Sequence, residues 1–149
     1  MDSIKYRDGY KYQLAEDYQI QTTIYPKADI ITEYIFLTMQ GLLTVKEGYS
    51  WDGASGPTID TKSSMRAGLV HDAFYQLLRG ELISQHYREA ADGLLRDLMI
   101  EDAMKIRKEW PEFMKKLAIM RAKAWYWSVR KFAMSAANPE NDKKVMCAP

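Results

Sequence analysis

The sequence is poor in cysteine and in long apolar runs. It has one cysteine among 149 residues, so no disulfide can form within the chain, which excludes a small disulfide-stapled scaffold. Its apolar runs reach only about five residues, far short of the ~20 that a membrane-spanning helix needs. Charged residues are spread through the first twenty positions, so we expect neither a signal peptide nor a transmembrane segment.

Apolar and aromatic residues are plentiful, at 47% and 12% of the chain. This composition excludes disorder as the main state, and the length fits one domain. We assign residues 1–137 to a single α+β domain. The polar, proline-containing stretch at 138–149 is predicted to be a flexible tail.

Charge is distributed unevenly although the total is only +1. Residues 1–62 and 63–104 both carry a small acidic excess, whereas residues 105–149 carry 11 basic and 4 acidic side chains. A basic C-terminal third can contact an anionic partner, such as phospholipid or nucleic acid, or the acidic part of the same chain. We favour the intramolecular or simply solvated alternative.

Residues 10–49 have the patterning of β-strands. Apolar and aromatic residues recur at even spacing from Tyr12 to Ile24, interrupted at Ala15-Glu16-Asp17, which we predict to be a hairpin turn. A second pair of strands is expected at 30–39 and 42–45, joined by a turn at Gln40-Gly41. The N-terminal part is thus predicted to form a small antiparallel sheet.

An ordered glycine-rich loop and three helices are expected to follow the strands. The loop spans residues 48–62, where three glycines and a proline disfavour any regular element. Helical spacing and capping residues predict helices at 63–79, 84–106 and 110–134.

The first of these helices carries the candidate chemistry. On a helical wheel, Leu69, Ala73 and Leu77 form an apolar stripe, whereas His71, Asp72, Tyr75 and Gly68 share the other side. Asp72 has no basic residue three or four positions away, so a helical ion pair does not explain it. The plainer alternative is a hydrogen-bonded His71–Tyr75 pair beside a solvated Asp72.

The second helix contributes Asp92, for which ordinary pairing with Arg88 and Arg96 on the helix surface is the simplest interpretation. Asp97, Glu101 and Asp102 are expected to form a solvated acidic edge, and His86 to lie on the surface.

Several motifs in the order of the chain resemble a family of unknown function that is common in bacteriophages and prophages. The resemblance spans about residues 45–133 and implies a phage- or prophage-type protein, located in the host cytoplasm or the virion. It rests on Gly48-Tyr49-x-x-Asp52-Gly53-Ala54-Ser55-Gly56-Pro57, His71-Asp72-Ala73-Phe74-Tyr75, Ala91-Asp92 and Tyr126-x-x-Val129-Arg130-x-Phe132.

A remoter similarity is to the secreted phospholipase A2 pattern, in which a glycine-rich loop precedes His-Asp-x-x-Tyr on one helix and Asp on an antiparallel helix. The resemblance implies that His71 is the general base, that Tyr75 and Asp92 orient it, and that Asp72 binds Ca²⁺. Backbone oxygens of the loop would complete the calcium site. This chain departs from that family in lacking disulfides. The binding loop implied here comprises Trp51, Asp52, Gly53, Ala54, Ser55, Gly56 and Pro57.

Two other functions stay open. Asp52, His71, Asp72 and Asp92 form a nitrogen and oxygen set suited to Zn²⁺ or Mn²⁺ in a hydrolase. In the alternative that we favour at this point, the same residues are a structural hub in a protein that binds a host or virion partner. The residues do not indicate an oligomeric state.

The third helix has two interpretations as well. Its tryptophans and basic residues are compatible with peripheral contact of residues 110–134 with anionic lipid. Stacking on nucleic acid is the less favoured reading, because an apolar series follows the spacing of an ordinary core-packing helix. That series is Leu117, Met120, Ala124, Trp127 and Phe132.

Overall fold

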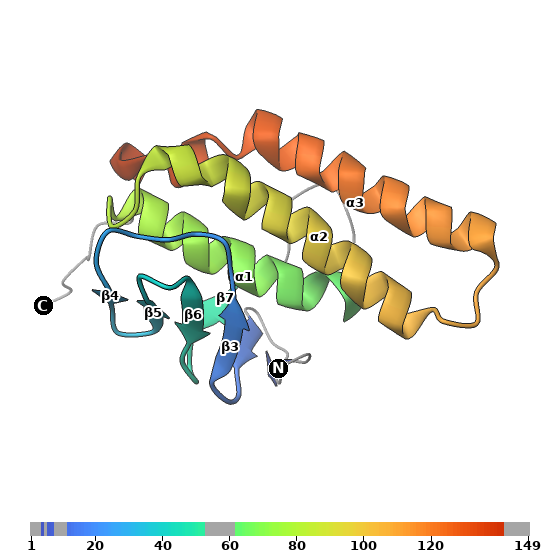
Figure 1. Ribbon diagram of the computed structural model, residues 1–149, viewed down its shortest axis with the longest axis horizontal. Helices are drawn as coiled ribbons and strands as arrows, with labels where there is room; N and C mark the ends of the chain where they lie inside the picture. The colour runs from blue at the N-terminus through green and yellow to red at the C-terminus, as the bar shows by residue number, and fades with distance from the viewer. Residues whose placement is uncertain (1–3, 5, 8–11, 53–61, 142–149) are drawn as a thin grey trace, which may run out of the picture.

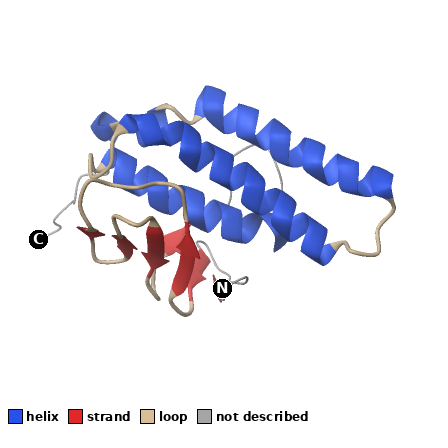
Figure 2. Ribbon diagram, in the orientation of Figure 1, coloured by secondary structure: helices blue, strands red, loops and turns tan. Residues whose placement is uncertain are grey.

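The structure is a computed structural model that describes residue 4 and residues 6–7, 12–52 and 62–141. Strands come first in the chain and helices follow, which confirms the predicted α+β class. The three long helices lie alongside one another, and the strands gather beside α1 (Figures 1 and 2). Among the described residues, no helix combines the length and apolar character needed to cross a membrane.

The strands form two small antiparallel sheets. The first has the order β1 (Tyr6–Arg7), β2 (Tyr12–Leu14), β7 (Ser50–Trp51), and the second β3 (Tyr18–Gln21), β6 (Leu42–Val45), β5 (Ile35–Leu37), β4 (Ile30–Ile31).

The predicted hairpin at Ala15-Glu16-Asp17 is wrong, because the chain changes sheets there. β2 pairs with β1 and β7, whereas β3 pairs with β6. The Asp17 carboxylate accepts a hydrogen bond from Glu47 N at 2.8 Å and binds the Lys46 ammonium. These contacts fix the start of β3 against the end of β6, a long-range pairing that alternation alone does not specify.

The predicted turn at Gln40-Gly41 does join β5 to β6, in antiparallel register. Gly41 has φ +82°, and a Cβ atom there would lie 2.6 Å from Thr22 O. Only glycine meets both requirements without strain.

The expectation that residues 48–62 hold no regular element is wrong at the start of that segment. β7 pairs with β2 there, and Trp51 is buried with its ring 5.7 Å from that of Tyr12. The remaining predicted loop residues, Gly53, Ala54, Ser55, Gly56 and Pro57, lie outside the described residues.

The helices are α1 (Lys62–Arg79), α2 (Arg88–Ile106) and α3 (Glu112–Phe132). Within the described ranges, short 3-10 turns accompany them: η1 (Gln85–Tyr87), η2 (Ser135–Ala137) and η3 (Pro139–Asn141). The helix predicted from residue 84 thus begins as a 3-10 turn, and η3 contacts α1 within the segment predicted to be a flexible tail.

Helix α1 is the centre of the core. It contacts α2 on one side and the strands on the other, so that every residue from Ser63 to Tyr75 except Asp72 is buried. The wheel predicted one buried stripe, but burial here extends around the helix because neighbours cover both faces. The polar residues of α1 are therefore held inside the protein, where hydrogen bonding decides their energetics.

Candidate functional site

The site is built around Asp92, whose side chain is 0% exposed. Its Oδ1 accepts hydrogen bonds from His71 Nε2 at 2.8 Å and from Tyr75 Oη at 2.7 Å. Its Oδ2 accepts one from Arg130 Nη1 at 3.0 Å. One carboxylate on α2 thus binds two side chains of α1 and one of α3.

The local sequence explains how α1 supplies two of these donors. His71 and Tyr75 are four residues apart, which places them one above the other on a helix face. Their ring centroids are 4.1 Å apart. The structure thus brings together His71, Tyr75 and Asp92, three of the residues singled out from the sequence.

Arg88 links this Asp92 cluster, which comprises Asp92, His71, Tyr75 and Arg130, to the end of α3. Its Nε donates to Tyr75 Oη at 3.2 Å, and its Nη2 donates to the carbonyls of Val129 and Arg130 at 2.8 Å each. Carbonyls in the last turn of a helix carry partial negative charge, so a buried guanidinium suits this position.

The predicted placement of Asp92 on the helix surface is wrong, because the residue is buried. The expected pairing with Arg88 is present, with Arg88 Nε 4.0 Å from Asp92 Oδ2, whereas Arg96 instead binds Asp97 at 2.8 Å. Sequence reasoning missed the bonds of Arg88 to Tyr75 and to the end of α3, and the bond of Arg130 to Asp92. Arg130 was part of the Tyr126-x-x-Val129-Arg130 motif, but nothing in the spacing connects it to an aspartate 38 positions earlier.

The hydrogen bonds around Asp92 determine its charge. Burial alone raises the pKa of a carboxyl group, but the bonds from His71, Tyr75 and Arg130 outweigh burial and lower the pKa of Asp92 below its ordinary value. Burial likewise lowers the pKa of His71 by itself, while the carboxylates of Asp72 and Asp92 outweigh it and raise that pKa. Burial also raises the pKa of Tyr75, which is therefore a neutral donor.

Asp72 lies on the other side of the His71 ring. His71 Nδ1 is 3.9 Å from Asp72 Oδ1, and the Asp72 side chain keeps 24% of its exposure. That distance is too long for a direct hydrogen bond but allows a bridging water. Burial raises the pKa of Asp72 most, and the negative charge of Asp52 raises it further. Asp52 and Asp72 therefore act on each other electrostatically.

No group of three His, Cys, Asp or Glu side chains within the described ranges is arranged to hold a metal ion. The set predicted for Zn²⁺ or Mn²⁺ is thus divided, because Asp92 binds His71 Nε2 whereas Asp72 lies 3.9 Å from His71 Nδ1. Asp52 interacts with Asp72 electrostatically, and carboxylates are hard oxygen ligands of the type that Ca²⁺ prefers. Gly53, also predicted as a ligand, lies outside the described residues, and Trp51 is buried against β2.

A second buried charged centre joins α1 to α2. Arg66 donates to both oxygens of Asp102, from Nε at 3.0 Å and from Nη2 at 2.7 Å, and to Tyr18 Oη at 3.3 Å. Asp102 is 7% exposed, so its predicted place on a solvated acidic edge is wrong. The physical reason is that Arg66, on another helix, faces this side of α2.

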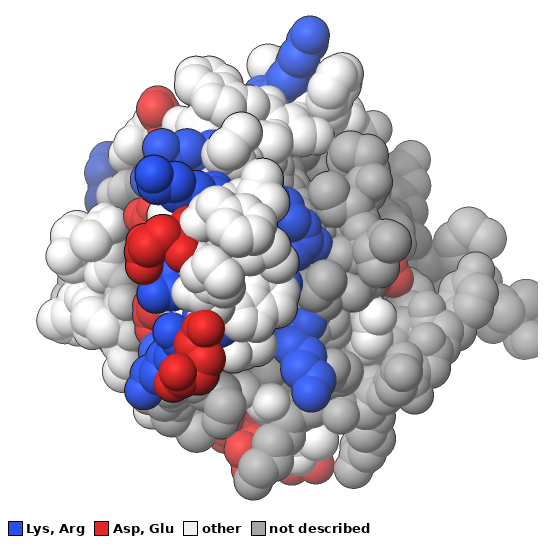
Figure 3. Space-filling view, turned by 90° about the vertical axis from the view of Figure 1, so that its right-hand side faces the viewer, with Lys and Arg blue, Asp and Glu red and all other residues white. Residues whose placement is uncertain are grey.

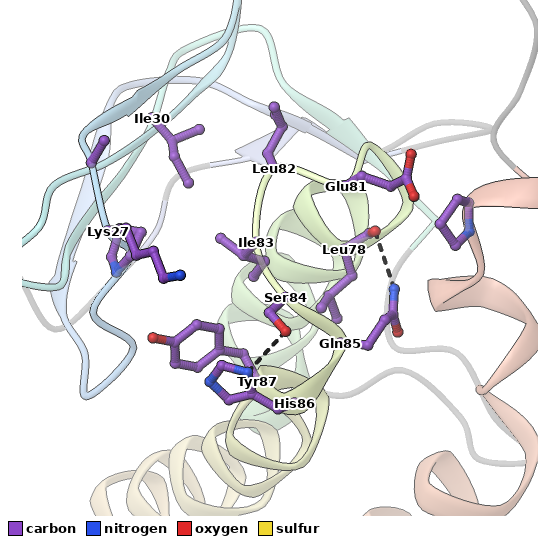
Figure 4. Close-up of a pocket in the computed structure, with 13 residues that line it drawn as sticks. Lys27, Ile30, Leu78, Glu81, Leu82, Ile83, Ser84, Gln85, His86 and Tyr87 are labelled. Atoms are coloured by element: carbon purple, nitrogen blue, oxygen red, sulfur yellow. Dashed lines mark hydrogen bonds between the residues drawn. The ribbon is translucent and has the colours of Figure 1, made fainter.

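A cavity of about 490 Å³ lies between the β3–β4 connection and the turn that joins α1 to α2. Figure 4 shows apolar side chains, among them Ile30 and Ile83, beside Lys27, Ser84 and Tyr87. His86 is exposed there, as predicted, and its Nδ1 is 2.8 Å from Ser84 Oγ. None of the predicted site residues that the structure describes lines this cavity.

The arrangement around His71 is suited to general-base chemistry. We assign the ring proton to Nε2, because Nε2 faces the ionised Asp92 carboxylate. The Nδ1 lone pair is then available on the side of Asp72 and can accept a proton from water. No family model, curated protein or solved structure matches the chain.

Proposed function

We propose that this protein is a hydrolase in which His71 activates a water molecule for attack on an ester carbonyl. The observation that carries the proposal is the bond of His71 Nε2 to a fully buried Asp92, with Nδ1 directed to the side of a second carboxylate. A histidine held in one tautomer by a buried carboxylate is an effective general base.

The other residues of the site would have distinct roles in this reaction. Asp92 orients the imidazole and stabilises the imidazolium that forms when Nδ1 takes a proton from water. Tyr75 and Arg130 fix the Asp92 carboxylate, and Arg88 fixes the hydroxyl of Tyr75. Water attacks the carbonyl carbon, and the proton on Nδ1 is then returned to the leaving alkoxide.

Ca²⁺ is the metal that best fits the carboxylates on the substrate side. Asp72 and Asp52 would hold it, since a divalent cation offsets the repulsion between the two carboxylates, which adds to the larger effect of burial on the pKa of Asp72. When bound, such an ion polarises the carbonyl and stabilises the negative charge on its oxygen. The similarity to the phospholipase A2 pattern points to the same ester chemistry.

The test is hydrolysis of short-chain diacyl phospholipids and nitrophenyl esters, with Ca²⁺ or with EDTA. His71→Gln is the decisive variant, because the glutamine amide can still donate to Asp92 but cannot act as a base. We expect activity to fall about 10²–10⁴-fold. The matched control is His86→Gln, which changes the exposed histidine and should leave the rate unchanged.

Equal activity in His71→Gln and the unaltered protein would contradict the proposed base. Absence of hydrolysis of every ester tested, with and without Ca²⁺, would contradict the hydrolase itself. A thermal melt gives an independent measure of the metal, since a hundredfold excess of ligand over its dissociation constant stabilises the fold by about 2.7 kcal/mol. That shift should disappear in Asp72→Asn.

The second candidate is a phage- or prophage-type protein that binds a host or virion protein, with His71 and Asp92 as a structural hub. It is favoured by the number of elements that Asp92 joins, because bonds to α1 and α3 stabilise the three-helix layer without any chemistry. This function predicts that His71→Gln changes only stability, and that no metal raises the melting temperature.

A further inference from the structure

Helix α3 carries two apolar stripes on different sides. The inner stripe, which faces α2, is buried and consists of Ala118, Ala122, Trp125 and Val129. The outer stripe consists of Phe113, Leu117, Met120, Ala124 and Trp127, all of them exposed. The sequence-based expectation that Leu117, Met120, Ala124, Trp127 and Phe132 pack in the core is therefore wrong.

The outer stripe is regular and strongly exposed. Its members follow one another at intervals of four, three, four and three residues, which keeps them on one line along a helix. Leu117 is 54% exposed, Met120 63% and Trp127 68%. Burial of the inner stripe already explains why α3 folds onto α2, so folding does not account for the outer one.

The charges beside the outer stripe indicate what kind of surface could bind to it. Lys116 and Lys123 lie along one edge and Arg121 along the other, and Lys131 continues the line of the stripe. α3 contains six basic residues and one acidic residue, Glu112, which binds Lys115. Figure 3 looks onto the end where α2 leads into α3, where basic groups lie on both sides of uncharged atoms and acidic groups are also present.

A second copy of the chain does not fit this stripe. Pairing two α3 helices along it, parallel or antiparallel, would set lysine or arginine of one copy against lysine or arginine of the other. Like charges at these flanking positions oppose association. The occupant must therefore be apolar where it meets the stripe and anionic at its edges.

We propose that the outer stripe of α3 binds the surface of an anionic phospholipid bilayer, with α3 lying in the plane of the interface. A bilayer presents acyl chains below a layer of negative headgroups, which matches an apolar line edged by lysines. Trp127 suits the headgroup boundary because its ring is apolar and its N–H is polar. Lysine stems extend along apolar surface while their ammonium groups reach the headgroups.

This proposal does not depend on the hydrolase. Arg130, the α3 residue of the Asp92 cluster, faces inward, so changes in the stripe leave that site intact. The experiment is sedimentation of the full chain with phosphatidylcholine vesicles, with and without phosphatidylglycerol. Binding is expected only with phosphatidylglycerol, and it should weaken when ionic strength rises from about 0.1 M to about 1 M, since the Debye length then shrinks from about 10 Å to about 3 Å.

Two pairs of variants locate the binding surface. Leu117→Gln with Trp127→Gln should weaken vesicle binding by more than about tenfold, because each side chain loses its apolar burial. The matched control makes the same kind of change at two exposed positions outside α3, Ile31→Gln with Leu82→Gln. Lys116→Gln with Lys123→Gln should weaken binding by about thirtyfold, at about 1 kcal/mol for each lysine, compared with Lys27→Gln and Lys62→Gln.

All of these positions are exposed, so the variants should retain the unaltered melting temperature. Vesicle binding that is equal in the stripe variant and its control would overturn the proposal. So would a lack of binding to phosphatidylglycerol vesicles, or a dimer that the stripe variant converts to monomer. Binding to an acidic protein without binding to vesicles would assign the stripe to a protein partner and equally overturn it.

Discussion

The Asp92 cluster and the Arg66–Asp102 pair both join α1 to α2 through buried charges, yet they differ in chemistry. In the Arg66–Asp102 pair an arginine, charged at every accessible pH, donates to both oxygens of a carboxylate. In the Asp92 cluster the central partner is His71, whose second ring nitrogen faces Asp72 and makes no hydrogen bond within the described parts of the chain.

This difference shows that burial of charge is not by itself a sign of function. The Arg66–Asp102 pair is satisfied by its own geometry and contains no histidine, the side chain whose ordinary pKa is near neutral pH. The Asp92 cluster holds such a group and leaves one of its atoms available. Helix α1 therefore carries a structural ion pair near its start and a candidate site near its middle.

Asp92→Asn is expected to have the largest effect on stability. The amide keeps the shape of the carboxylate but removes the charge that His71 and Arg130 bind. Loss of one partner of a buried ion pair costs about 3–5 kcal/mol, which lowers the melting temperature by roughly 10 °C for a domain of this size.

Asp97→Asn is the matched control, since it makes the same change on the same helix at an exposed ion pair. It should cost less than about 1 kcal/mol. Equal effects of the two substitutions on the free energy of unfolding would show that the Asp92 cluster is not a major contributor to the stability of the fold.

Replacement of the Arg66–Asp102 pair tests whether this ion pair has only a structural role. Arg66→Met alone leaves Asp102 buried without its partner and should cost about 3 kcal/mol. The double change Arg66→Met with Asp102→Leu should restore most of that loss, because buried ion pairs are often replaced by apolar residues without net cost. Ester hydrolysis should survive in the double variant; loss of hydrolysis in a folded double variant would show that the two centres are coupled.

The acid dependence of stability should differ between Asp92 and its control. The pKa of Asp92 is lowered in the folded protein, so its contribution is complete above the unfolded value of about 4. It is lost as pH falls through the lower folded pKa, because protons then bind preferentially to the unfolded state. Urea unfolding between pH 3 and pH 7 should show a shallower acid decline for Asp92→Asn than for Asp97→Asn; parallel curves would contradict the assigned pKa shift.

The smallest effect is expected from the two tyrosines. Tyr75→Phe removes the donor to Asp92 and an acceptor of Arg88, and should cost about 1–2 kcal/mol. Tyr18→Phe removes only a 3.3 Å bond from Arg66 and should cost about 1 kcal/mol or less. Thermal melts of both variants check the order, and a larger loss for Tyr18→Phe would reverse the ranking of the two centres.

Parts of the candidate site could be predicted from the sequence because they are local. The four-residue spacing of His71 and Tyr75 fixes their shared face on any helix. Arg130 and Arg88 could not be assigned in this way, since their roles arise from the crossing of α3 over α2. The same holds for Asp102, which resembles a solvated residue until Arg66 is placed against it.

Strand pairing likewise could not be predicted from local sequence. Alternation predicted strands around Tyr12 and Tyr18, but the intervening change of sheet depends on the contact of Asp17 with the end of β6. A hairpin and a crossing between sheets have the same local pattern. Pairing is decided by segments that lie about thirty residues away in the chain.

The sequence by itself determined the division into strands followed by helices, because side-chain periods of two and of 3.6 residues are local properties of the backbone. It also determined that His71 and Tyr75 lie one above the other. Only the tertiary structure decided which groups bind Asp92 and which stripe of α3 is buried. A helix with two apolar stripes can pack through either one, and the neighbour that covers α3 is α2, a separate segment that no periodicity within α3 can specify.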